Sequence, residues 1–140
     1  MDGNAYRLEV VTPERRVIGE DVEFLVAPAW TGEVGILKNH APLVAALKIG
    51  VMHFTVNGQT RYVAIGGGLL EVNENMVIML AESAELGSEI DVDRAKAAKE
   101  RAEARLADKR DNINMLRAQL ALERALSRIQ AYEAENSSYA

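Results

Sequence analysis

Glycine and proline stop at one point in the chain, and this limits how the chain can fold more than any other feature. All ten glycines lie at or before Gly87, and all three prolines lie in the first third. The 53 residues after Gly87 contain neither residue but include 12 alanines. Glycine and proline form turns and interrupt helices, whereas alanine favours helix. We therefore predict two unlike domains, residues 1–86 and residues 87–140.

Composition and charge exclude several classes of protein. Of the 140 residues, 49% are apolar and 26% are charged, as is typical of a globular protein. The chain lacks an apolar run of about 18 residues that could span a membrane, and its N-terminus does not resemble a secretory signal. Without cysteine it cannot form a disulfide framework or a thiolate metal site. A net charge of −5 argues against general nucleic-acid binding. We expect no metal ion and no nucleic-acid partner.

The first domain shows the pattern of an all-β fold. Residues 5–82 form short apolar stretches separated by turn residues roughly every 8–10 positions, a spacing typical of a sandwich or barrel. Asn57 and Gly58 lie between two strand-like runs and predict a two-residue hairpin, because both turn positions need a positive φ. Three glycines at 66–68 lack the lysine of a phosphate loop, so we expect a bulge or crossover where backbones approach closely. The prediction is an antiparallel β-sandwich of about ten strands.

Glu33 and His40 are the candidates for acid/base chemistry in this domain. They lie seven residues apart in a glycine-containing segment, and a carboxylate and an imidazole can form a catalytic pair. No serine, aspartate or cysteine is placed to complete a nucleophilic site. We therefore expect a loop or docking surface here rather than catalysis, and the chain is predicted not to be an enzyme.

The second domain predicts a helical hairpin. From Asp91 onward the sequence is rich in strong helix formers, and Asp91 is a good N-cap residue. We expect one helix over 92–108, a polar turn at 108–112 and a second helix over 113–132, with the tail at 136–138 fraying. A β-sandwich followed by an antiparallel two-helix hairpin is an α+β fold with segregated parts.

The apolar faces of both predicted helices consist of small or sparsely spaced side chains. On the first helix the stripe is mostly alanine: Ala95, Ala98, Ala102 and Leu106. On the second helix the stripe follows the spacing of a coiled-coil seam: Met115, Ala118, Leu122, Ala125, Ile129 and Tyr132. At about 25 cal/mol per Å², a mostly alanine contact stabilises by only a few kcal/mol. The hairpin is therefore expected to be able to detach or extend.

Arginines form a matching stripe on each predicted helix. The first stripe consists of Arg94, Arg101 and Arg105, and the second of Arg117, Arg124 and Arg128. In a hairpin that turns near 110–112, Arg94 lies level with Arg128 and Arg105 level with Arg117. Guanidiniums brought together repel one another unless an anion lies between them, and arginine is well suited to phosphate. A solvated charged surface is the alternative interpretation.

Several motifs resemble one known family. Residues 32–37 read Gly-Glu-Val-Gly-Ile-Leu and are followed by His-Ala-Pro-Leu at 40–43, and residues 67–72 read Gly-Gly-Leu-Leu-Glu-Val. Together with the alanine-rich hairpin, this order resembles the epsilon subunits of the bacterial rotary (F-type) ATP synthase over nearly the whole chain. The resemblance implies an N-terminal β-sandwich and a C-terminal helical hairpin.

The resemblance also implies a role and a set of partners. The chain would be a non-catalytic central-stalk subunit whose sandwich binds the gamma subunit and rests on the membrane c-ring, coupling proton-driven rotation to ATP synthesis. Glu33 and His40 would lie in the c-ring interface. The subunit would be peripheral to the cell membrane on its cytoplasmic side. The hairpin would permit activity when folded down and would inhibit ATP hydrolysis when extended along gamma into the alpha/beta head.

The hairpin is further similar to those of Bacillus-type epsilon subunits that bind ATP. Their motif, Ile/Leu-Asp-x-x-Arg-Ala, is present from Ile90 to Ala95. By this resemblance the residues that bind ATP as a regulatory ligand are Glu85, Ile90, Asp91, Arg94, Ala95, Arg101, Arg124 and Arg128. Glu85 and Asp91 would recognise adenine and ribose or order the site, and the arginines would hold the phosphates.

Two carboxylates depart from the expected pattern. Asp93 adds a negative charge inside the motif, which is expected to weaken anion binding. Glu123 reduces the positive charge that could grip an acidic loop of the catalytic head. Two alternatives stay open at this point: a rotor subunit whose hairpin inhibits without binding nucleotide, and an unrelated β-sandwich binding module with a coiled-coil tail.

Overall fold

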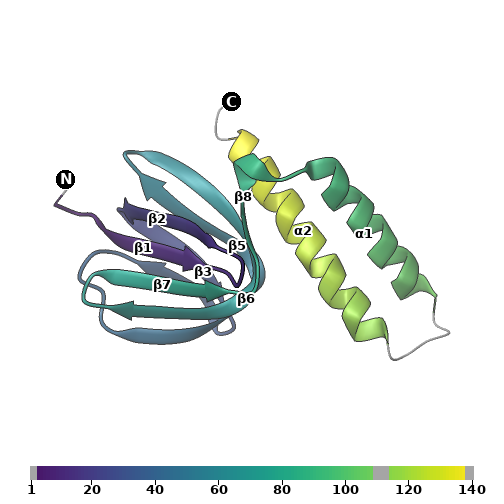
Figure 1. The fold of residues 1–140 in the computed structure, drawn as a ribbon, viewed down its shortest axis with the longest axis horizontal. Helices are drawn as coiled ribbons and strands as arrows, with labels where there is room; N and C mark the ends of the chain where they lie inside the picture. The colour runs from purple at the N-terminus through teal and green to yellow at the C-terminus, as the bar shows by residue number, and fades with distance from the viewer. Residues whose placement is uncertain (1–2, 109–113, 138–140) are drawn as a thin grey trace.

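A computed structural model describes residues 3–108 and 114–137 and divides them into a β-sandwich and a pair of helices (Figure 1). The sandwich occupies one end of the molecule, and the helices lie side by side at the other. In chain order the elements are β1 (Tyr6–Val11), β2 (Arg16–Val22), β3 (Phe24–Ala29), β4 (Gly32–Ile36), β5 (Leu43–Val56), β6 (Gln59–Asn73), β7 (Met76–Ala81), β8 (Ala84–Leu86), the 3-10 turn η1 (Gly87–Glu89), α1 (Val92–Ala107) and α2 (Met115–Ser137). The α+β class predicted from the sequence is confirmed.

The described strands form one hydrogen-bonded set that curves into a sandwich. Their order is β2-β1-β7-β6-β5-β3-β4, and β8 pairs with β6. All pairs are antiparallel except β1 with β7, which is parallel. The exception arises because β1 and β7 lie far apart in the sequence, and no hairpin turn forces them to run in opposite directions. The eight strands include two long ones, β5 and β6, of 14 and 15 residues.

The β5–β6 hairpin turns where the sequence predicted. Asn57 and Gly58 connect the strands with φ angles of 51° and 78°. β6 then continues through the glycines at 66–68, where the sequence predicted a bulge or crossover with a close approach of backbones. Its first half pairs with β8 and its second half with β7. A Cβ on Gly68 would lie 2.0 Å from the carbonyl oxygen of Leu80, so glycine is required for the close backbone approach at this crossing.

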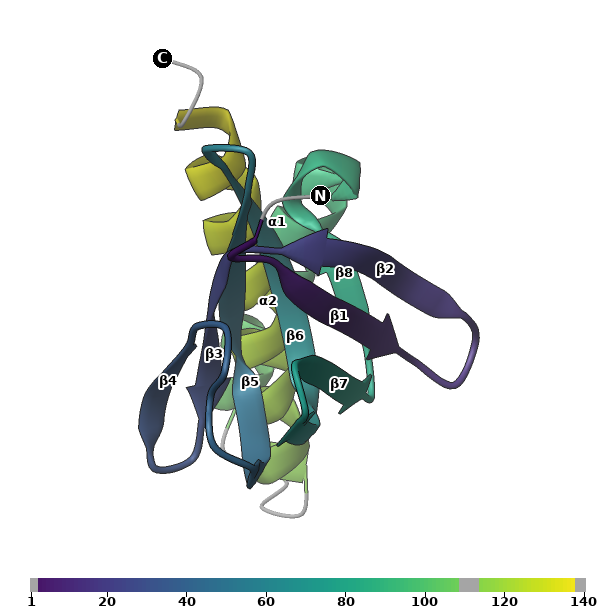
Figure 2. The same ribbon diagram turned by 90° about the vertical axis from the view of Figure 1, so that its left-hand side faces the viewer.

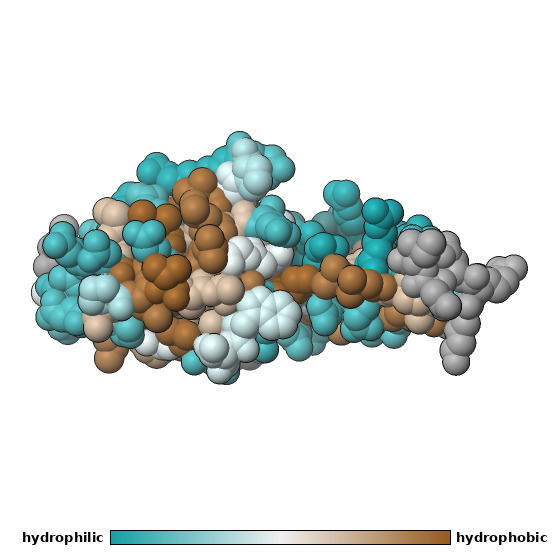
Figure 3. Space-filling model, turned by 90° about the horizontal axis from the view of Figure 1, so that it is seen from below, coloured by the Kyte–Doolittle hydropathy of each residue, from teal (hydrophilic) through white to brown (hydrophobic). Residues whose placement is uncertain are grey.

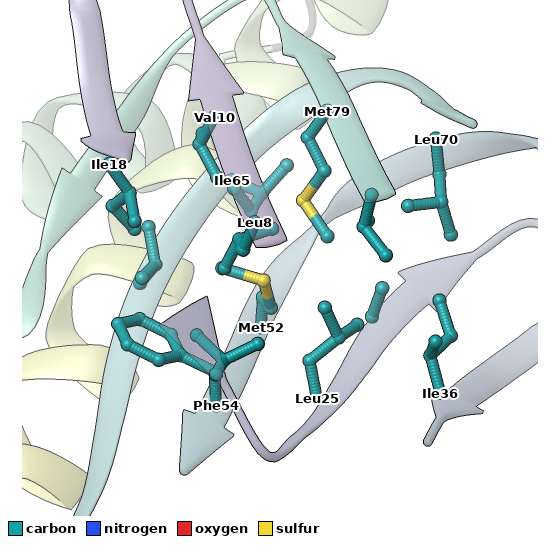
Figure 4. Packing of buried hydrophobic residues seen from close by; sticks show 14 of the residues in the cluster. Leu8, Val10, Ile18, Leu25, Ile36, Met52, Phe54, Ile65, Leu70 and Met79 are labelled. Atoms are coloured by element: carbon teal, nitrogen blue, oxygen red, sulfur yellow. The ribbon is translucent and has the colours of Figure 1, made fainter. Parts of the chain in front are cut away.

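Large side chains from the strands fill the core of the sandwich (Figure 4). Among them are the fully buried Leu8, Leu25, Ile36, Met52, Phe54, Ile65, Leu70 and Met79. The buried Tyr6 hydroxyl donates a hydrogen bond of 2.6 Å to the carbonyl oxygen of Ile36, at the end of β4. Burial raises the pKa of Tyr6 above its ordinary value. The core therefore also fixes the segment that leads to His40.

The first helix begins where the sequence predicted, and the second ends later than predicted; the predicted start of the second helix at 113 lies outside the described residues. α1 begins after Asp91, whose side chain accepts a hydrogen bond of 3.1 Å from the amide of Arg94, as an N-cap residue does. α2 continues to Ser137, beyond the predicted end at 132 and through two positions expected to fray. Its last turns are held because Glu135 is buried against the sandwich. The predicted polar turn lies mostly outside the described residues.

α2 covers one side of the sandwich, and α1 lies on the outer side of α2 (Figures 1 and 2). Ala64 of β6, Ile90 of the linker and Ala131 of α2 form a second small cluster of buried residues. Between the helices the buried side chains are alanines: Ala95 and Ala102 on α1, and Ala118 and Ala125 on α2. The thin interhelical contact predicted from residue size is confirmed.

Candidate functional site

A cavity of about 470 Å³ lies where the linker, the start of α1 and the middle of α2 meet. Its walls consist of three arginines, three carboxylates and three small or apolar side chains. They are Arg94, Arg101, Arg128, Glu85, Glu89, Asp91, Ile90, Ala95 and Ala98. The cavity thus combines residues from β8, the linker and both helices. The formal charges of the three arginines and three carboxylates cancel, so a polar ligand can contact both cationic and anionic side chains in the cavity.

The local structure fixes the positions of the walls. Because Asp91 caps α1, Arg94 and Ala95 fall in the first turn of that helix. Arg101 follows Arg94 by seven residues, or about two helical turns, and so lies on the same side of α1. Asp93 is exposed and does not line the cavity. The extra carboxylate of Asp93, one of the two departures from the family pattern, therefore lies outside the cavity walls.

Glu85 and Arg128 form an ion pair across the cavity wall. The Nε of Arg128 lies 2.5 Å from Oε1 of Glu85, and the two side chains are 31% and 41% exposed. The pair joins β8 to α2, so the strand and the helix are connected at the cavity itself. The guanidinium nitrogens other than Nε can donate hydrogen bonds to an anion without breaking this contact.

Seven of the eight residues expected to bind ATP line this cavity: Glu85, Ile90, Asp91, Arg94, Ala95, Arg101 and Arg128. The structure does not bring the eighth, Arg124, to the same place. Arg124 lines another cavity of about 540 Å³ between α2 and the sandwich, with Lys48 and Glu82 among its walls. Of the two arginine stripes, Arg94 and Arg128 share the cavity, as their matched levels predicted. Arg105 and Arg117 are exposed and do not line it.

Two residues of the cavity were missed by the sequence analysis. Ala98 lies one turn after Ala95, and the three-residue spacing on one helical face could have identified it. Glu89 belongs to η1 and forms an ion pair of 3.7 Å with Arg15 in the β1–β2 loop. No sequence pattern marks Glu89, because its place depends on how the linker turns before α1.

Glu33 and His40 lie in the segment around β4. Glu33 is exposed on β4, opposite Pro28 of β3. His40 is half-buried, and its Nδ1 lies 2.6 Å from the carbonyl oxygen of Ala41. Asn39 is held by two hydrogen bonds to the side chain of Asn75, of 2.6 and 3.1 Å. The loop after β4 is therefore fixed to the β6–β7 turn, while Glu33 is exposed to solvent on β4 itself.

Comparisons with known proteins identify the family. The family model described as ATP synthase, delta/epsilon chain, beta-sandwich domain matches residues 5–87. The model described as ATP synthase, delta/epsilon chain, long alpha-helix domain matches residues 88–133. The chain belongs to the ATP synthase delta/epsilon family. Both halves of the fold are thus matched in the expected order.

Relatives support membership of the epsilon group, and a solved ATP synthase contains a chain of similar fold. The chain is 55% identical over 134 residues to the ATP synthase epsilon chain of Syntrophomonas wolfei, covering 95% of this chain and 98% of the relative. It is 52% identical over 126 residues to that of Desulfitobacterium hafniense strain Y51, covering 90% and 95%. A chain in the mitochondrial ATP synthase of Euglena gracilis matches with a TM-score of 0.76 and 25% identity, covering 96% of this chain and 84% of that one.

This epsilon subunit is a non-catalytic component of the central stalk of an F-type ATP synthase. That membership removes the unrelated binding module as an interpretation. Among the described residues, neither helix is long and apolar enough to cross a membrane. The same residues hold no cluster of three or more potential metal ligands of the histidine, cysteine and carboxylate types.

Proposed function

We propose that this epsilon subunit senses ATP through its hairpin and thereby regulates ATP hydrolysis by the complex. ATP in the cavity bridges the linker, α1 and α2 and stabilises the compact hairpin. When ATP is scarce, the hairpin opens, extends along gamma and inhibits the alpha/beta head. The observation that carries the proposal is the convergence of Arg94, Arg101 and Arg128 with Glu85 and Asp91 around one cavity.

The cavity fits a nucleotide in size and chemistry. Its volume of about 470 Å³ lies within the usual range of small-molecule sites. Arg94 and Arg101 approach from α1 and Arg128 from α2, so a triphosphate can be held from both helices by forked hydrogen bonds. The carboxylates of Glu85 and Asp91 can accept hydrogen bonds from an adenine amine or ribose hydroxyls. We also propose Arg124 as a ligand that reaches the phosphates only when α2 shifts.

The energies of ligand binding and hairpin packing are of similar size. A mostly alanine interface stabilises the compact hairpin by a few kcal/mol at about 25 cal/mol per Å². A ligand at 100 times its Kd stabilises the state that it binds by about 2.7 kcal/mol. ATP concentration can therefore shift the balance between the compact and extended hairpins.

Calorimetric titration of the full chain with ATP tests the proposal. We expect the wild type to bind ATP, and Arg94→Ala/Arg101→Ala to abolish the signal. Arg105→Ala/Arg117→Ala is the matched control, because it removes two arginines from the same helical stripes outside the cavity. A wild type that releases no heat with ATP favours the alternative, a hairpin that inhibits without binding nucleotide. Equal loss in both double variants contradicts the assignment of the site.

The sandwich offers a surface for the gamma subunit. Trp30, Leu69 and Leu80 are 72%, 51% and 55% exposed. They lie close together on neighbouring strands. The amide of Trp30 bonds to the carbonyl oxygen of Ala46, Ala46 is opposite Leu69, and Leu69 is opposite Leu80. On the face seen in Figure 3, apolar side chains gather over the sandwich and continue along the hairpin. Large exposed apolar patches mark interaction sites. We propose that gamma covers this patch.

Co-purification with gamma tests that surface. Leu69→Glu and Leu80→Glu are expected to abolish binding, because each places a charge in an apolar interface. Leu37→Glu is the matched control, since Leu37 is 62% exposed in the loop after β4. We propose the loop, with Glu33 and His40, as the contact with the c-ring, so Leu37→Glu should leave gamma binding intact. Retained binding in the Leu69 and Leu80 variants contradicts the assignment.

Binding to gamma and the c-ring also implies where the subunit lies in the cell and which role each domain has. We propose that residues 1–86 dock to gamma and the c-ring, and that residues 87–140 form the regulatory domain. The subunit then lies at the cytoplasmic side of the cell membrane, held there peripherally through the complex. Fractionation of cells with and without gamma tests this location, because loss of gamma should release the subunit from the membrane fraction.

A further inference from the structure

One arginine joins three separate segments of the molecule. The Nε of Arg61, on β6, donates a hydrogen bond of 2.9 Å to Oε1 of Glu135 near the end of α2. The Nη2 of the same side chain donates a hydrogen bond of 3.1 Å to Oγ of Ser88 in η1. The sandwich, the linker and the end of the second helix therefore meet at a single guanidinium.

Glu135 is almost completely buried although its side chain is a carboxylate. Its side chain is 2% exposed, whereas that of Arg61 is 32% exposed. A carboxylate buried to this extent is stable only while it is paired, because it has lost most of its hydration. The contact therefore favours the docked helix only while both partners are present.

The linker packs directly against the same part of α2. A Cβ on Gly87 would lie 2.6 Å from the carbonyl oxygen of Ala131 and 3.0 Å from Cβ of Glu135. One residue before Arg128, the Oγ of Ser127 donates a hydrogen bond of 2.8 Å to the carbonyl oxygen of Gly50 on β5. This close packing makes the position of the linker depend on the position of α2.

These contacts lie next to the nucleotide cavity. Arg128 and Glu135 are seven residues apart on α2, or about 10 Å along two helical turns. Gly87 and Ser88 lie in the chain between Glu85 and Ile90, which are both cavity walls. A helix fixed at Glu135 therefore keeps Arg128 facing Glu85 and the linker.

We propose that Arg61, Ser88 and Glu135 form a latch that holds α2 on the sandwich and positions Arg128 in the cavity. The inference rests on the proposed function, because it specifies what opposes release of the hairpin. In the released state both charges return to water, so the pair contributes only to the docked state. Loss of Arg61 leaves the carboxylate of Glu135 buried without this partner, and loss of the Glu135 charge removes the ion pair, so either change shifts the equilibrium toward release.

Hydrogen–deuterium exchange on the full chain tests the latch without nucleotide. Glu135→Gln keeps the size of the side chain and removes its charge. We expect the amides of 127–137 to exchange at least about tenfold faster in this variant, while β1 and β7 exchange as in the wild type. Glu133→Gln is the matched control, since Glu133 is exposed on the same helix, and its exchange should not change. Unchanged exchange of α2 in Glu135→Gln overturns the latch.

A double-mutant cycle separates a specific pair from a general loss of stability. Arg61→Gln, Glu135→Gln and the double variant are compared by the same exchange measurement. If the residues act as a pair, the double variant exchanges no faster than the faster single variant. Fully multiplicative increases show independent effects and overturn the assignment.

ATP titration of the same variants separates this inference from the proposed function. We expect Glu135→Gln to raise the apparent Kd for ATP by the factor by which it lowers the docked fraction of α2, because only the docked helix places Arg128 in the cavity. An ATP affinity that stays unaltered although exchange shows a fall in the docked fraction overturns the positioning of Arg128. A wild type that does not bind ATP overturns the proposed function, while the exchange results still decide the latch.

Discussion

The sandwich and the hairpin are stabilised by side chains of very different size. The sandwich core is made of residues such as Phe54, Leu8 and Met52, which are almost completely buried. The helices meet through alanines, and α2 is held on the sandwich partly by Ser127 and Glu135. Burying a large aliphatic or aromatic side chain stabilises by about 1.5–3 kcal/mol, against about 0.8 kcal/mol per buried methylene. One part is therefore suited to remain folded while the other moves.

The largest effect is expected in the sandwich. Phe54→Ala should lower the free energy of unfolding by about 3–5 kcal/mol, because it opens a cavity in the core. Urea unfolding followed by the signal of the β-sheet measures this loss. Val44→Ala is the control on the same strand, since Val44 is 70% exposed, and it should change stability by less than about 0.5 kcal/mol. An equal loss in both variants contradicts the assignment of the core.

A second prediction separates the two regions. Gly87→Ala forces a Cβ against the backbone of Ala131, and overpacking of this kind costs about 1–3 kcal/mol. The cost should fall on docking of α2 and leave the sandwich intact, so hydrogen exchange should accelerate in α2 alone. Gly35→Ala is the control, because its Cβ would make only ordinary contacts with Phe24. Faster exchange throughout the sandwich contradicts the independence of the two regions.

The start of α1 gives a smaller and more local effect. Asp91→Ala removes the acceptor for the amide of Arg94, and loss of an N-cap costs about 0.5–2 kcal/mol. Exchange of the amides in the first turn of α1 measures it. Asp93→Ala is the control, because this exposed side chain in the same turn does not cap the helix. An equal effect of both substitutions shows a general charge effect instead.

The smallest effect concerns a polar contact inside the sandwich. Tyr6→Phe removes the hydrogen bond to the carbonyl oxygen of Ile36 and should cost about 0.5–1.5 kcal/mol near neutral pH. Because burial raises the pKa of Tyr6 above its ordinary value near 10, the folded state keeps its proton after the unfolded chain begins to lose it. The contribution of Tyr6 is therefore complete below about pH 10 and decreases above it.

Unfolding measured between pH 8 and 11, about the ordinary pKa of tyrosine, checks this dependence. The wild type should lose stability above about pH 10 more steeply than Tyr6→Phe. Tyr62→Phe is the control, since Tyr62 is half-buried beside His53 and has no comparable role in the core. Parallel pH profiles for the wild type and Tyr6→Phe contradict the prediction.

The candidate site was predicted from the sequence largely through spacing and resemblance. Asp91 was expected to cap α1, and Arg94 and Arg128 were expected at the same level of the hairpin; both expectations agree with the structure. Arg124 lies elsewhere because it faces the sandwich rather than α1. Glu89 was missed because the turn of η1, and not a helical period, brings it to the cavity. The proposed ATP binding stays a prediction.

The sequence by itself determined the elements whose causes are local. The Asn57-Gly58 turn, the two helices and the alanine-lined contact follow from backbone preference, capping and side-chain size over a few neighbouring residues. Only the tertiary structure decided the parallel pairing of β1 with β7, the continuous path of β6 through its glycines, and the burial of Glu135 against Arg61. These depend on contacts between segments far apart in the chain, whose stability comes from packing and desolvation that no local pattern encodes.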